Sequence, residues 1–337
     1  MVTGKLSNAL LEDIVFKYIR YRREDVITGA AVGEDNAIVD FGDEVAILST
    51  DPITGAANDI GSLAVNISCN DISTSGGEPI GLLMTILAPP DATYEDIQMI
   101  MKDAGETAEK LNVEIIGGHT EITDAVNKIV VSTTAIGKIN KKKLSQIEDI
   151  KIGDKVVVSK FIGIEGTSIL LNDLEGYFID KLNRNIIDIG KSYSSLISVV
   201  KEGKIGGEIG VNYMHDITEG GVLGAIWEAH RAIGKGIRIE RKSIPITDVT
   251  RSMSEILGIN PLRLISSGSM LMIVSDNQLE ELRDRFEEEK IGLSIIGEVI
   301  EDGIYIEDRG KSKTIEPPEA DELYRALDRF NTLNLQN

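Results

Sequence analysis

The sequence is poor in cysteine and in long apolar runs, and both shortages exclude classes of protein. Cys69 is the only cysteine among 337 residues, so an internal disulfide framework and a zinc site of four cysteines are excluded. No run of about 18 apolar residues is present, and the segment 1–5 lacks the apolar core of a signal peptide. We therefore expect a cytoplasmic protein that does not enter the membrane.

Basic residues are also few. Lys and Arg total 35 against 55 Asp and Glu, which gives a formal net charge of −20. Nucleic-acid binding through the general field of the protein is not expected, because contacts to phosphate need Lys and Arg. The acidity can simply serve solubility. If the ligand is an anionic nucleotide, a divalent cation has to screen the repulsion.

Common catalytic motifs are missing as well. The sequence contains neither a Gly-x-x-x-x-Gly-Lys-Ser/Thr loop nor a Gly-x-Gly-x-x-Gly turn after a strand. A serine nucleophile elbow and a His-Glu-x-x-His helix are absent too. Any use of ATP must therefore depend on a site of another kind.

The length and the hydrophobic content predict two globular domains. Hydrophobic residues make up 42% of the chain, which is enough for ordinary cores. The stretch 140–153 is rich in lysine and polar residues and lacks a sustained period, so we interpret it as the connection. The predicted domains are residues 1–145 and 146–337.

Strand and helix patterns alternate in both halves. Ser7 is expected to cap a first helix with apolar residues from Leu10 to Ile19, and Thr93 with Asp96 resembles a capping box. The strand 44–50 is expected to end at Asp51-Pro52, and the strand 113–116 at the loop 117–120. Further strands are expected at 80–87, 128–139, 154–159, 236–240, 269–275 and 293–299, and further helices at 60–75, 166–174, 188–202, 222–233 and 277–290. After Pro318 we expect one short helix at most. This alternation permits either a parallel doubly wound sheet or an α+β layer.

Four carboxylates stand at the ends of predicted elements, where side chains can converge on a cleft. These are Asp35, Asp51, Asp71 and Glu121. Mg²⁺ binds one or two carboxylates together with phosphate oxygens and water. The set therefore suits metal ions at a triphosphate, although each residue alone can be a turn or cap residue.

Two glycine-containing segments precede predicted helices and have two interpretations each. The segment 215–221, which contains Thr218, Gly220 and Gly221, and the segment 163–167 can present backbone N–H groups to an anion. Alternatively, Asp216 or Thr218 is a plain N-cap. His119 can be a metal ligand or an acid–base group, or neither. Cys69 and Trp227 are expected in the core.

Six segments in this order resemble the superfamily of aminoimidazole ribonucleotide synthetase, the hydrogenase maturation factor HypE, selenophosphate synthetase and thiamine-monophosphate kinase. The segments are GEDNA at 33–37, STDP at 49–52, NDISTSGGEP at 70–79, GGHTE at 117–121, GIEGT at 163–167 and HDITEGG at 215–221. The motifs are most similar to those of HypE.

The resemblance implies the α+β, PurM-like fold of aminoimidazole ribonucleotide synthetase. An N-terminal sheet domain would pair with that of a second copy in a homodimer and form the nucleotide clefts, and an α/β sandwich domain would follow. It also implies ATP and Mg²⁺ as cofactors. The implied metal ligands are Asp35, Asp51, Asp71 and Glu121; the implied nucleotide-binding residues are Asp35, Asp51, Asn70, Asp71, Gly117, Gly118, Gly163, Gly166, Thr218, Gly220 and Gly221; the implied catalytic residues are His119, Glu121, His215 and Asp216.

The chemistry that the resemblance implies is phosphorylation of an amide-type oxygen or another weak nucleophile. A carboxamide oxygen leaves poorly as hydroxide and well as phosphate, so the protein has to position groups and stabilise charge.

Three departures from the family pattern bear on the substrate. His119 stands where the kinases have Asp, and Glu219 stands where HypE has Arg. HypE ends in a cysteine that receives a carbamoyl group, whereas this sequence ends at Asn337 and its thiol is Cys69. We therefore expect a HypE-like enzyme that acts on a different, small substrate. The alternatives are a maturation protein that serves a metalloenzyme through partner proteins, and a non-catalytic nucleotide-binding dimer.

Overall fold

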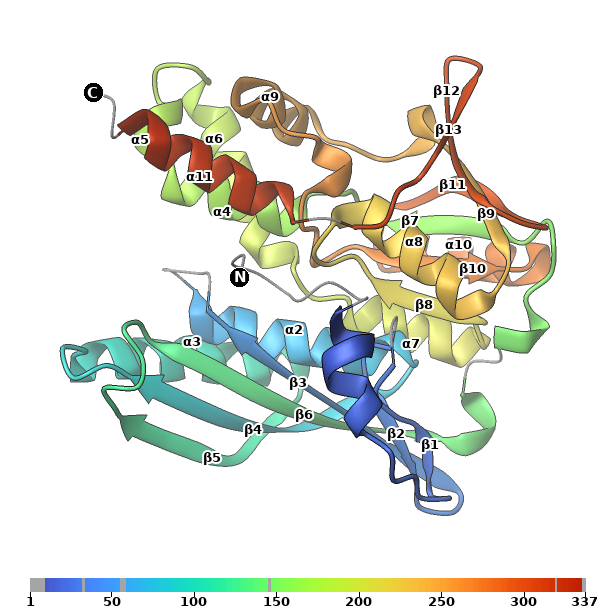
Figure 1. The fold of residues 1–337 in the computed structure, drawn as a ribbon, viewed down its shortest axis with the longest axis horizontal. Helices are drawn as coiled ribbons and strands as arrows, with labels where there is room; N and C mark the ends of the chain where they lie inside the picture. The colour runs from blue at the N-terminus through green and yellow to red at the C-terminus, as the bar shows by residue number, and fades with distance from the viewer. Residues whose placement is uncertain (1–9, 32–33, 55–58, 145–146, 319, 335–337) are drawn as a thin grey trace.

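The computed structural model describes residues 10–31, 34–54, 59–144, 147–318 and 320–334. Two sheets, one in each half of the chain, organise the molecule (Figure 1). Most strand pairs in both sheets are antiparallel, which decides for the α+β alternative. The expected cap Ser7 and the predicted boundary at 145 and 146 lie outside the described residues.

The first half is a sheet covered on one face by two helices. Among the described residues, six strands follow the order β1-β2-β3-β6-β4-β5, with β4 and β5 parallel. Their bounds are β1 Val26–Thr28, β2 Ala37–Asp40, β3 Glu44–Ile53, β4 Glu78–Ala88, β5 Glu114–Ile122 and β6 Val130–Asn140. The helices α2 (Ile60–Thr74) and α3 (Tyr94–Leu111) lie between this sheet and the second half (Figure 1). The capping box of Thr93 and Asp96 at the start of α3 is confirmed.

Two strands run further than predicted. Strand β3 continues through Asp51 and Pro52 because β6 pairs with both residues, whereas β2 pairs with β3 only as far as Leu48. Beyond that point β3 is an edge on this side, and an edge strand tolerates a residue without an N–H group. Strand β5 includes the expected loop 117–120. Gly118 permits this, since a Cβ atom there would lie 1.8 Å from the carbonyl oxygen of Met84 on β4.

The second half is built on a sheet with helices on both faces. Among the described residues, seven strands follow the order β13-β12-β9-β11-β7-β10-β8. Their bounds are β7 Lys155–Ser159, β8 Tyr213–Asp216, β9 Gly236–Glu240, β10 Met270–Val274, β11 Leu293–Ile300, β12 Ile304–Asp308 and β13 Lys311–Thr314.

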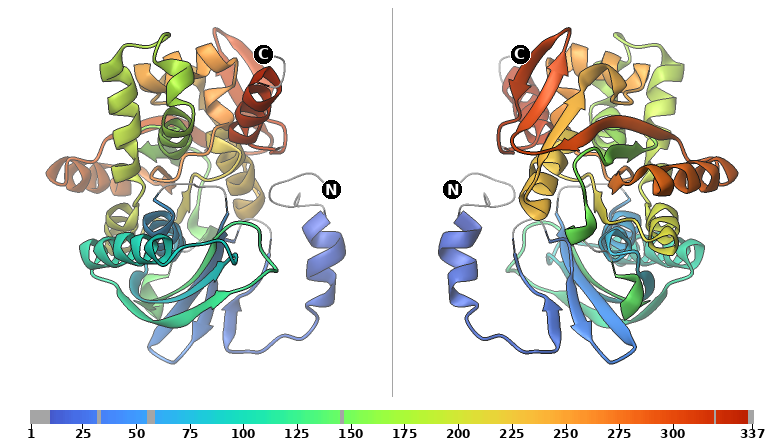
Figure 2. Two further views of the ribbon diagram at one scale, coloured as in Figure 1. Left: turned by 90° about the vertical axis from the view of Figure 1, so that its left-hand side faces the viewer. Right: turned by 90° about the vertical axis from the view of Figure 1, so that its right-hand side faces the viewer.

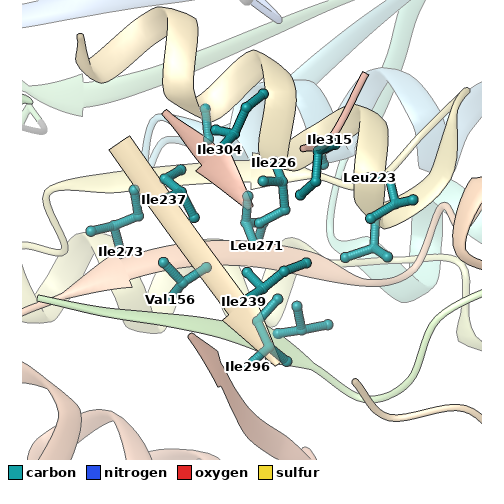
Figure 3. Close-up of a cluster of buried hydrophobic side chains, with 14 of the residues drawn as sticks. Val156, Leu223, Ile226, Ile237, Ile239, Leu271, Ile273, Ile296, Ile304 and Ile315 are labelled. Carbon is teal, nitrogen blue, oxygen red and sulfur yellow. The ribbon is translucent and has the colours of Figure 1, made fainter. Parts of the chain in front are cut away.

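The central strand β7 shows how the two faces are covered. Val156 and Val158 pack with residues of α8 (Gly221–Ile233), and Val157 packs on the opposite face with residues near α7 (Val200–Ile209) and α10 (Asp276–Glu288). Figure 3 shows the first of these clusters. A strand that is buried on both faces reads as a continuous apolar run instead of an alternating one.

The remaining helices form a layer around α4, with their own apolar cluster. They are α4 Ile164–Asp173, α5 Glu175–Phe178, α6 Arg184–Lys191, α9 Asp248–Leu257 and α11 Glu322–Asn334. The expected helix 188–202 is divided among α6, η5 (Ser192–Leu196) and α7, and α11 is longer than the short terminal helix predicted. Single turns are η1 Leu11–Val15, η2 Phe16–Tyr18, η3 Lys141–Lys143, η4 Ile147–Asp149, η6 Arg241–Ser243 and η7 Pro261–Arg263.

The core predictions for two residues are confirmed. Cys69 is fully buried, and Trp227 is partly buried against the core of the second half. None of the helices in the described part of the chain combines the length and the apolarity that a membrane crossing requires.

Candidate active site

Acidic side chains from both halves meet where α2 packs against β3 and β8. Asp51 lies on β3, Asp71 near the end of α2 and Asp216 at the end of β8, while Asp35 precedes β2. Together with His215 we call these residues the acidic cluster. They are at most partly exposed, and Asp71, His215 and Asp216 are buried. The structure thus joins residues that lie up to 181 positions apart in the sequence, Asp35 and Asp216.

His215 lies between two carboxylates. Its Nδ1 is 2.7 Å from Asp35 Oδ2, and its Nε2 is 3.0 Å from Glu228 Oε2. Burial lowers the pKa of His215, but the carboxylate of Asp35 and the further hydrogen bonds raise it well above the ordinary value. Both ring nitrogens therefore face carboxylate oxygens at hydrogen-bond distance, an arrangement that favours the protonated ring.

Asp216 is buried without a hydrogen-bond partner for either carboxylate oxygen among the described residues. Burial and, next, the negative charge of Asp35 raise the pKa of Asp216 to about 8. Ligand atoms of Asp35, His215 and Asp216 lie within 4.8 Å of one another. A buried, unpartnered carboxylate beside a second carboxylate is the arrangement that a divalent cation stabilises.

Asp71 extends the cluster toward Asp51. Burial, followed by the charges of Asp216 and Asp51, raises the pKa of Asp71 well above its usual range. The hydroxyl of Ser49 donates to Asp71, and it lies 3.5 Å from Asp51 Oδ2. The mutual repulsion of these carboxylates and the orphaned oxygens of Asp216 fit Mg²⁺, which takes oxygen ligands.

A network that the sequence analysis missed holds Asp35 in place. The side-chain amide of Asn36 donates to the carbonyl oxygen of Asp71 at 2.6 Å and to Thr74 Oγ1 at 3.1 Å. Ser75 in turn donates to Asn36 Oδ1 at 3.1 Å. The residue next to Asp35 therefore ties this segment to the end of α2. Its place within GEDNA was the available signal.

Asn70 connects the two halves of the chain. Its amide donates to the carbonyl oxygen of Ile197 at 2.9 Å and accepts from the N–H group of Val199 at 2.8 Å. The side chain is fully buried. Its contacts therefore align α2 with the second half, and nucleotide binding by Asn70 stays a prediction.

The two helix starts are occupied by groups of the protein itself. At α4, the N–H groups of Gly163 and Gly166 donate to Ser266 Oγ at 2.7 Å and to the carbonyl oxygen of Ile265 at 3.0 Å. At α8, the N–H group of Gly220 donates to Asp321 Oδ2 at 2.7 Å. The alternative in which Asp216 or Thr218 caps α8 is wrong, since this helix has no side-chain cap at its N-cap position.

Two residues near the chain end support this region and gave no local signal in the sequence. The carboxylate of Asp321 also accepts from the N–H groups of Ile265 at 3.2 Å and Leu323 at 2.8 Å. Tyr324 donates its hydroxyl to Glu219 Oε1 at 3.0 Å. Glu219, which departs from the family pattern, thus has a hydrogen-bond partner that lies 105 positions away in the sequence.

His119 and Glu121 lie apart from the acidic cluster. Both are on the edge strand β5, with side chains 67% and 52% exposed and a separation of 3.4 Å. Register pairs connect Asp51 to Gly118 through Thr133 and Met84, so three strand spacings, about 14 Å, separate them. Within one subunit Glu121 does not reach the other predicted metal ligands. A shared site with Glu121 would need a second copy.

Two halves of the sequence match the same family. Residues 33–139 match the N-terminal domain of AIR synthase related proteins, and residues 151–308 match the C-terminal domain. The boundary at 145 and 146 falls between the two matches and stays a prediction.

Similar proteins match most of the length of the chain. A hydrogenase expression/formation protein of Methanocaldococcus jannaschii is 30% identical over 96% of both chains. The carbamoyl dehydratase HypE of Escherichia coli is 26% identical over 82% of this chain and 81% of its own.

Solved structures extend the similarity to the fold. A HypE–HypF complex contains a chain with a TM-score of 0.71 and 26% identity, covering 92% of this chain and 100% of the other. A HypE structure in complex with ATP has a TM-score of 0.72 and 20% identity, covering 95% and 97%.

Proposed function

Because the chain belongs to the family of AIR synthase related proteins, we propose that it is an ATP-dependent enzyme whose acidic cluster holds Mg²⁺ at the nucleotide phosphates. The observation that carries this proposal is the buried Asp216, whose two carboxylate oxygens have no hydrogen-bond partner in the described part of the chain and lie beside Asp35 and close to Asp71. A relative named carbamoyl dehydratase and the HypE structure in complex with ATP support it.

The reaction we propose is phosphoryl transfer to an amide- or carbonyl-type oxygen of a small substrate. Mg²⁺, when bound, would neutralise the charge that develops on the transferred phosphoryl group. Asp35, Asp51, Asp71 and Asp216 would hold the ion. His215 is a positioning residue, because its hydrogen bond at 2.7 Å fixes the orientation of the Asp35 carboxylate.

The thiol of Cys69 is not suited to carry a carbamoyl group. Cys69 is fully buried in α2, and burial, with a smaller effect of Asp71, raises the pKa of its thiol to about 12. A buried thiol that stays protonated is a poor nucleophile. We therefore propose that the phosphorylated oxygen belongs to a small molecule and not to a carbamoyl group carried on Cys69.

A homodimer through the first sheet is part of the proposal. The face of this sheet opposite α2 and α3 exposes apolar side chains, with Ile80 43% and Leu83 42% exposed on β4 and Ile116 50% exposed on β5. An apolar sheet face of this kind is costly in water and is typical of an interface. Pairing would also bring the partner's edge strand close to this sheet. Sedimentation velocity should give a dimer for the wild type and a monomer for Leu83→Glu.

The similarity to the chain in the HypE–HypF complex favours one second candidate, a maturation enzyme that receives its substrate from a protein partner. Phosphate release that requires such a partner and fails with every small amide would support it. Turnover of a small carbamoyl or amide compound by the protein alone would exclude it.

Titration calorimetry tests the nucleotide site. ATP should bind the wild type only with Mg²⁺, and Asp51→Asn and Asp71→Asn should each weaken binding at least about 10-fold by removing a metal ligand. Asp284→Asn on the exposed surface of α10 is the matched control and should leave the affinity unchanged. Binding without Mg²⁺, or equal affinity in all variants, contradicts the proposed site.

A further inference from the structure

Apart from the acidic cluster, a polar cavity of about 240 Å³ lies between the two halves of the chain. It is bounded by the start of α2, by α3, by α4 and by η5. Figure 1 shows α2, α3 and α4 in the region where the halves face each other. Asp59 at this end of α2 is 12 residues from Asp71, which is about 18 Å along a helix. Among the described residues that line the cavity, none belongs to the acidic cluster, although Ile197 on its wall accepts a hydrogen bond from Asn70, the neighbour of Asp71.

The cavity has an excess of negative charge that the protein does not neutralise. Its charged lining consists of Asp59, Asp103 and Glu106 from the first half, Glu165 and Asp173 from the second, and Lys110. Within the described part of the chain, only Glu106 of these carboxylates forms an ion pair, with Lys102 at 3.9 Å. Asp59 stands at the N-cap position of α2, yet its side chain does not cap the helix. A cationic ligand would complement this surface.

Glu165 is the group that makes the cavity more than a solvated acidic surface. The residue is 8% exposed, and its Oε2 has no hydrogen-bond partner among the described residues. Burial, with the charges of Asp321 and Glu219 behind it, raises the pKa of Glu165 to about 7. Hydrogen bonding to Ser267 opposes this rise in pKa, but it leaves Oε2 unsatisfied. Tyr324, whose hydroxyl donates to Glu219, has a pKa raised chiefly by burial, and it lies close enough to Glu165 for the charge of Glu165 to add to the rise. A buried carboxylate oxygen without a partner normally has a ligand or an ion to satisfy it.

The arrangement of the carboxylates favours an extended organic cation over a metal ion. In the described residues, the group of three ligands that converges within 4.8 Å is Asp35, His215 and Asp216, and no such group lies in this cavity. Leu63, Ile169 and Ile197 contribute an apolar part of the lining. Carboxylates that do not converge on one point, in a cavity whose lining is partly apolar, suit ammonium groups joined by a methylene chain. The volume suits a molecule smaller than a typical drug-sized ligand.

We propose that this cavity binds a small aliphatic di- or polyamine, with one ammonium group at Asp59 and Asp103 and another at Glu165 and Asp173. The ligand would then contact both halves of the chain, through α3 on one side and α4 on the other. Occupancy stabilises the packing of the halves against each other, because a ligand that binds only the folded state shifts the unfolding equilibrium.

Titration calorimetry with 1,4-diaminobutane at about pH 8, where Glu165 is ionised, tests this site. We expect one amine per chain in the wild type and at least about 10-fold weaker binding in Glu165→Gln and in Asp173→Asn, since each loses one charge partner. Glu280→Gln, an exposed residue on α10, should bind as the wild type does. Asp173 is exposed at the surface, so its variant tests the site even if Glu165→Gln folds poorly.

The same titration on Asp71→Asn separates this site from the nucleotide site. Unchanged amine binding in that variant supports a distinct cavity, whether or not ATP binds. Loss of amine binding in Asp71→Asn would place the amine in the acidic cluster and overturn the proposal. Absence of binding up to about 10 mM, equal affinity in all variants, or displacement of the amine by equimolar Mg²⁺ would overturn it as well.

Discussion

The acidic cluster and the His119–Glu121 pair both lie in segments that carry the family resemblance. The structure nevertheless buries most of the first and exposes the second. Asp71, His215 and Asp216 are each less than 10% exposed, whereas the side chains of His119 and Glu121 are more than half exposed. Burial turns neighbouring carboxylates into a coupled set with raised pKa values, as Asp71 and Asp216 show. An exposed pair 3.4 Å apart is screened by water and contributes little. Motif strength alone therefore does not predict the chemistry of a residue.

The largest difference between the two regions should appear in turnover. Asp71→Asn should lower ATP-dependent turnover about 1,000-fold, or ~4 kcal/mol, because it removes a carboxylate from the proposed metal site. Phosphate release with a responsive amide substrate measures this. Turnover within about 3-fold of the wild type would show that the cluster is not the catalytic site.

A buried carboxylate outside the acidic cluster, Glu165, should make the stability of the protein depend on pH. The pKa of Glu165 is about 7 in the folded protein against 4.5 for the free side chain, so the folded state retains the proton more tightly. Its contribution to stability is present below about pH 4.5 and is lost as the pH rises to about 7, with a change of ~3 kcal/mol.

Urea unfolding of the wild type and of Glu165→Gln, at about pH 5 and pH 8, isolates this contribution, because other titrating groups are common to both proteins. The variant should be the more stable protein at pH 8. Parallel stability profiles for the two proteins would contradict the prediction.

Loss of the hydrogen bonds of His215 should have an effect of intermediate size on Mg²⁺ binding. His215→Gln should lower the apparent affinity for Mg²⁺ in the ATPase reaction about 30-fold, ~2 kcal/mol, because Asp35 loses its fixed orientation. A positioning role predicts that saturating Mg²⁺ restores much of kcat. A fall in kcat that Mg²⁺ does not restore would instead indicate direct contact with the reacting groups.

The smallest effect is expected at the exposed pair. His119→Ala and Glu121→Gln should change the free energy of unfolding by less than about 0.5 kcal/mol, as is usual for exposed side chains, and thermal unfolding measures this. In the monomeric Leu83→Glu protein they should not alter ATP affinity. If they weaken ATP binding only in the dimer, the partner subunit's β5 completes the nucleotide site. The exposed pair would then share the function of the acidic cluster.

Local patterns predicted the elements that depend on neighbouring residues. The capping box at Thr93 begins α3, and the apolar run 270–274 forms β10, since both features are determined by residues close in sequence. The strand β8, which carries His215 and Asp216, was not predicted. It has four residues, and its assignment depends on pairing with β10, more than 50 positions away in the sequence.

The sequence by itself determined the family, the two-domain organisation and the carboxylates available to the candidate site, because motifs and composition are properties of the chain. It also placed Cys69 in the core. Tertiary structure decided which carboxylates meet. Helix α2 carries Asp71 to β8 and Asp216, while β5 keeps His119 and Glu121 three strands from Asp51. Asp321 at Gly220 and Glu165 at the inter-domain cavity likewise follow from packing. Burial and distance act between residues far apart in sequence, so local patterns do not encode them.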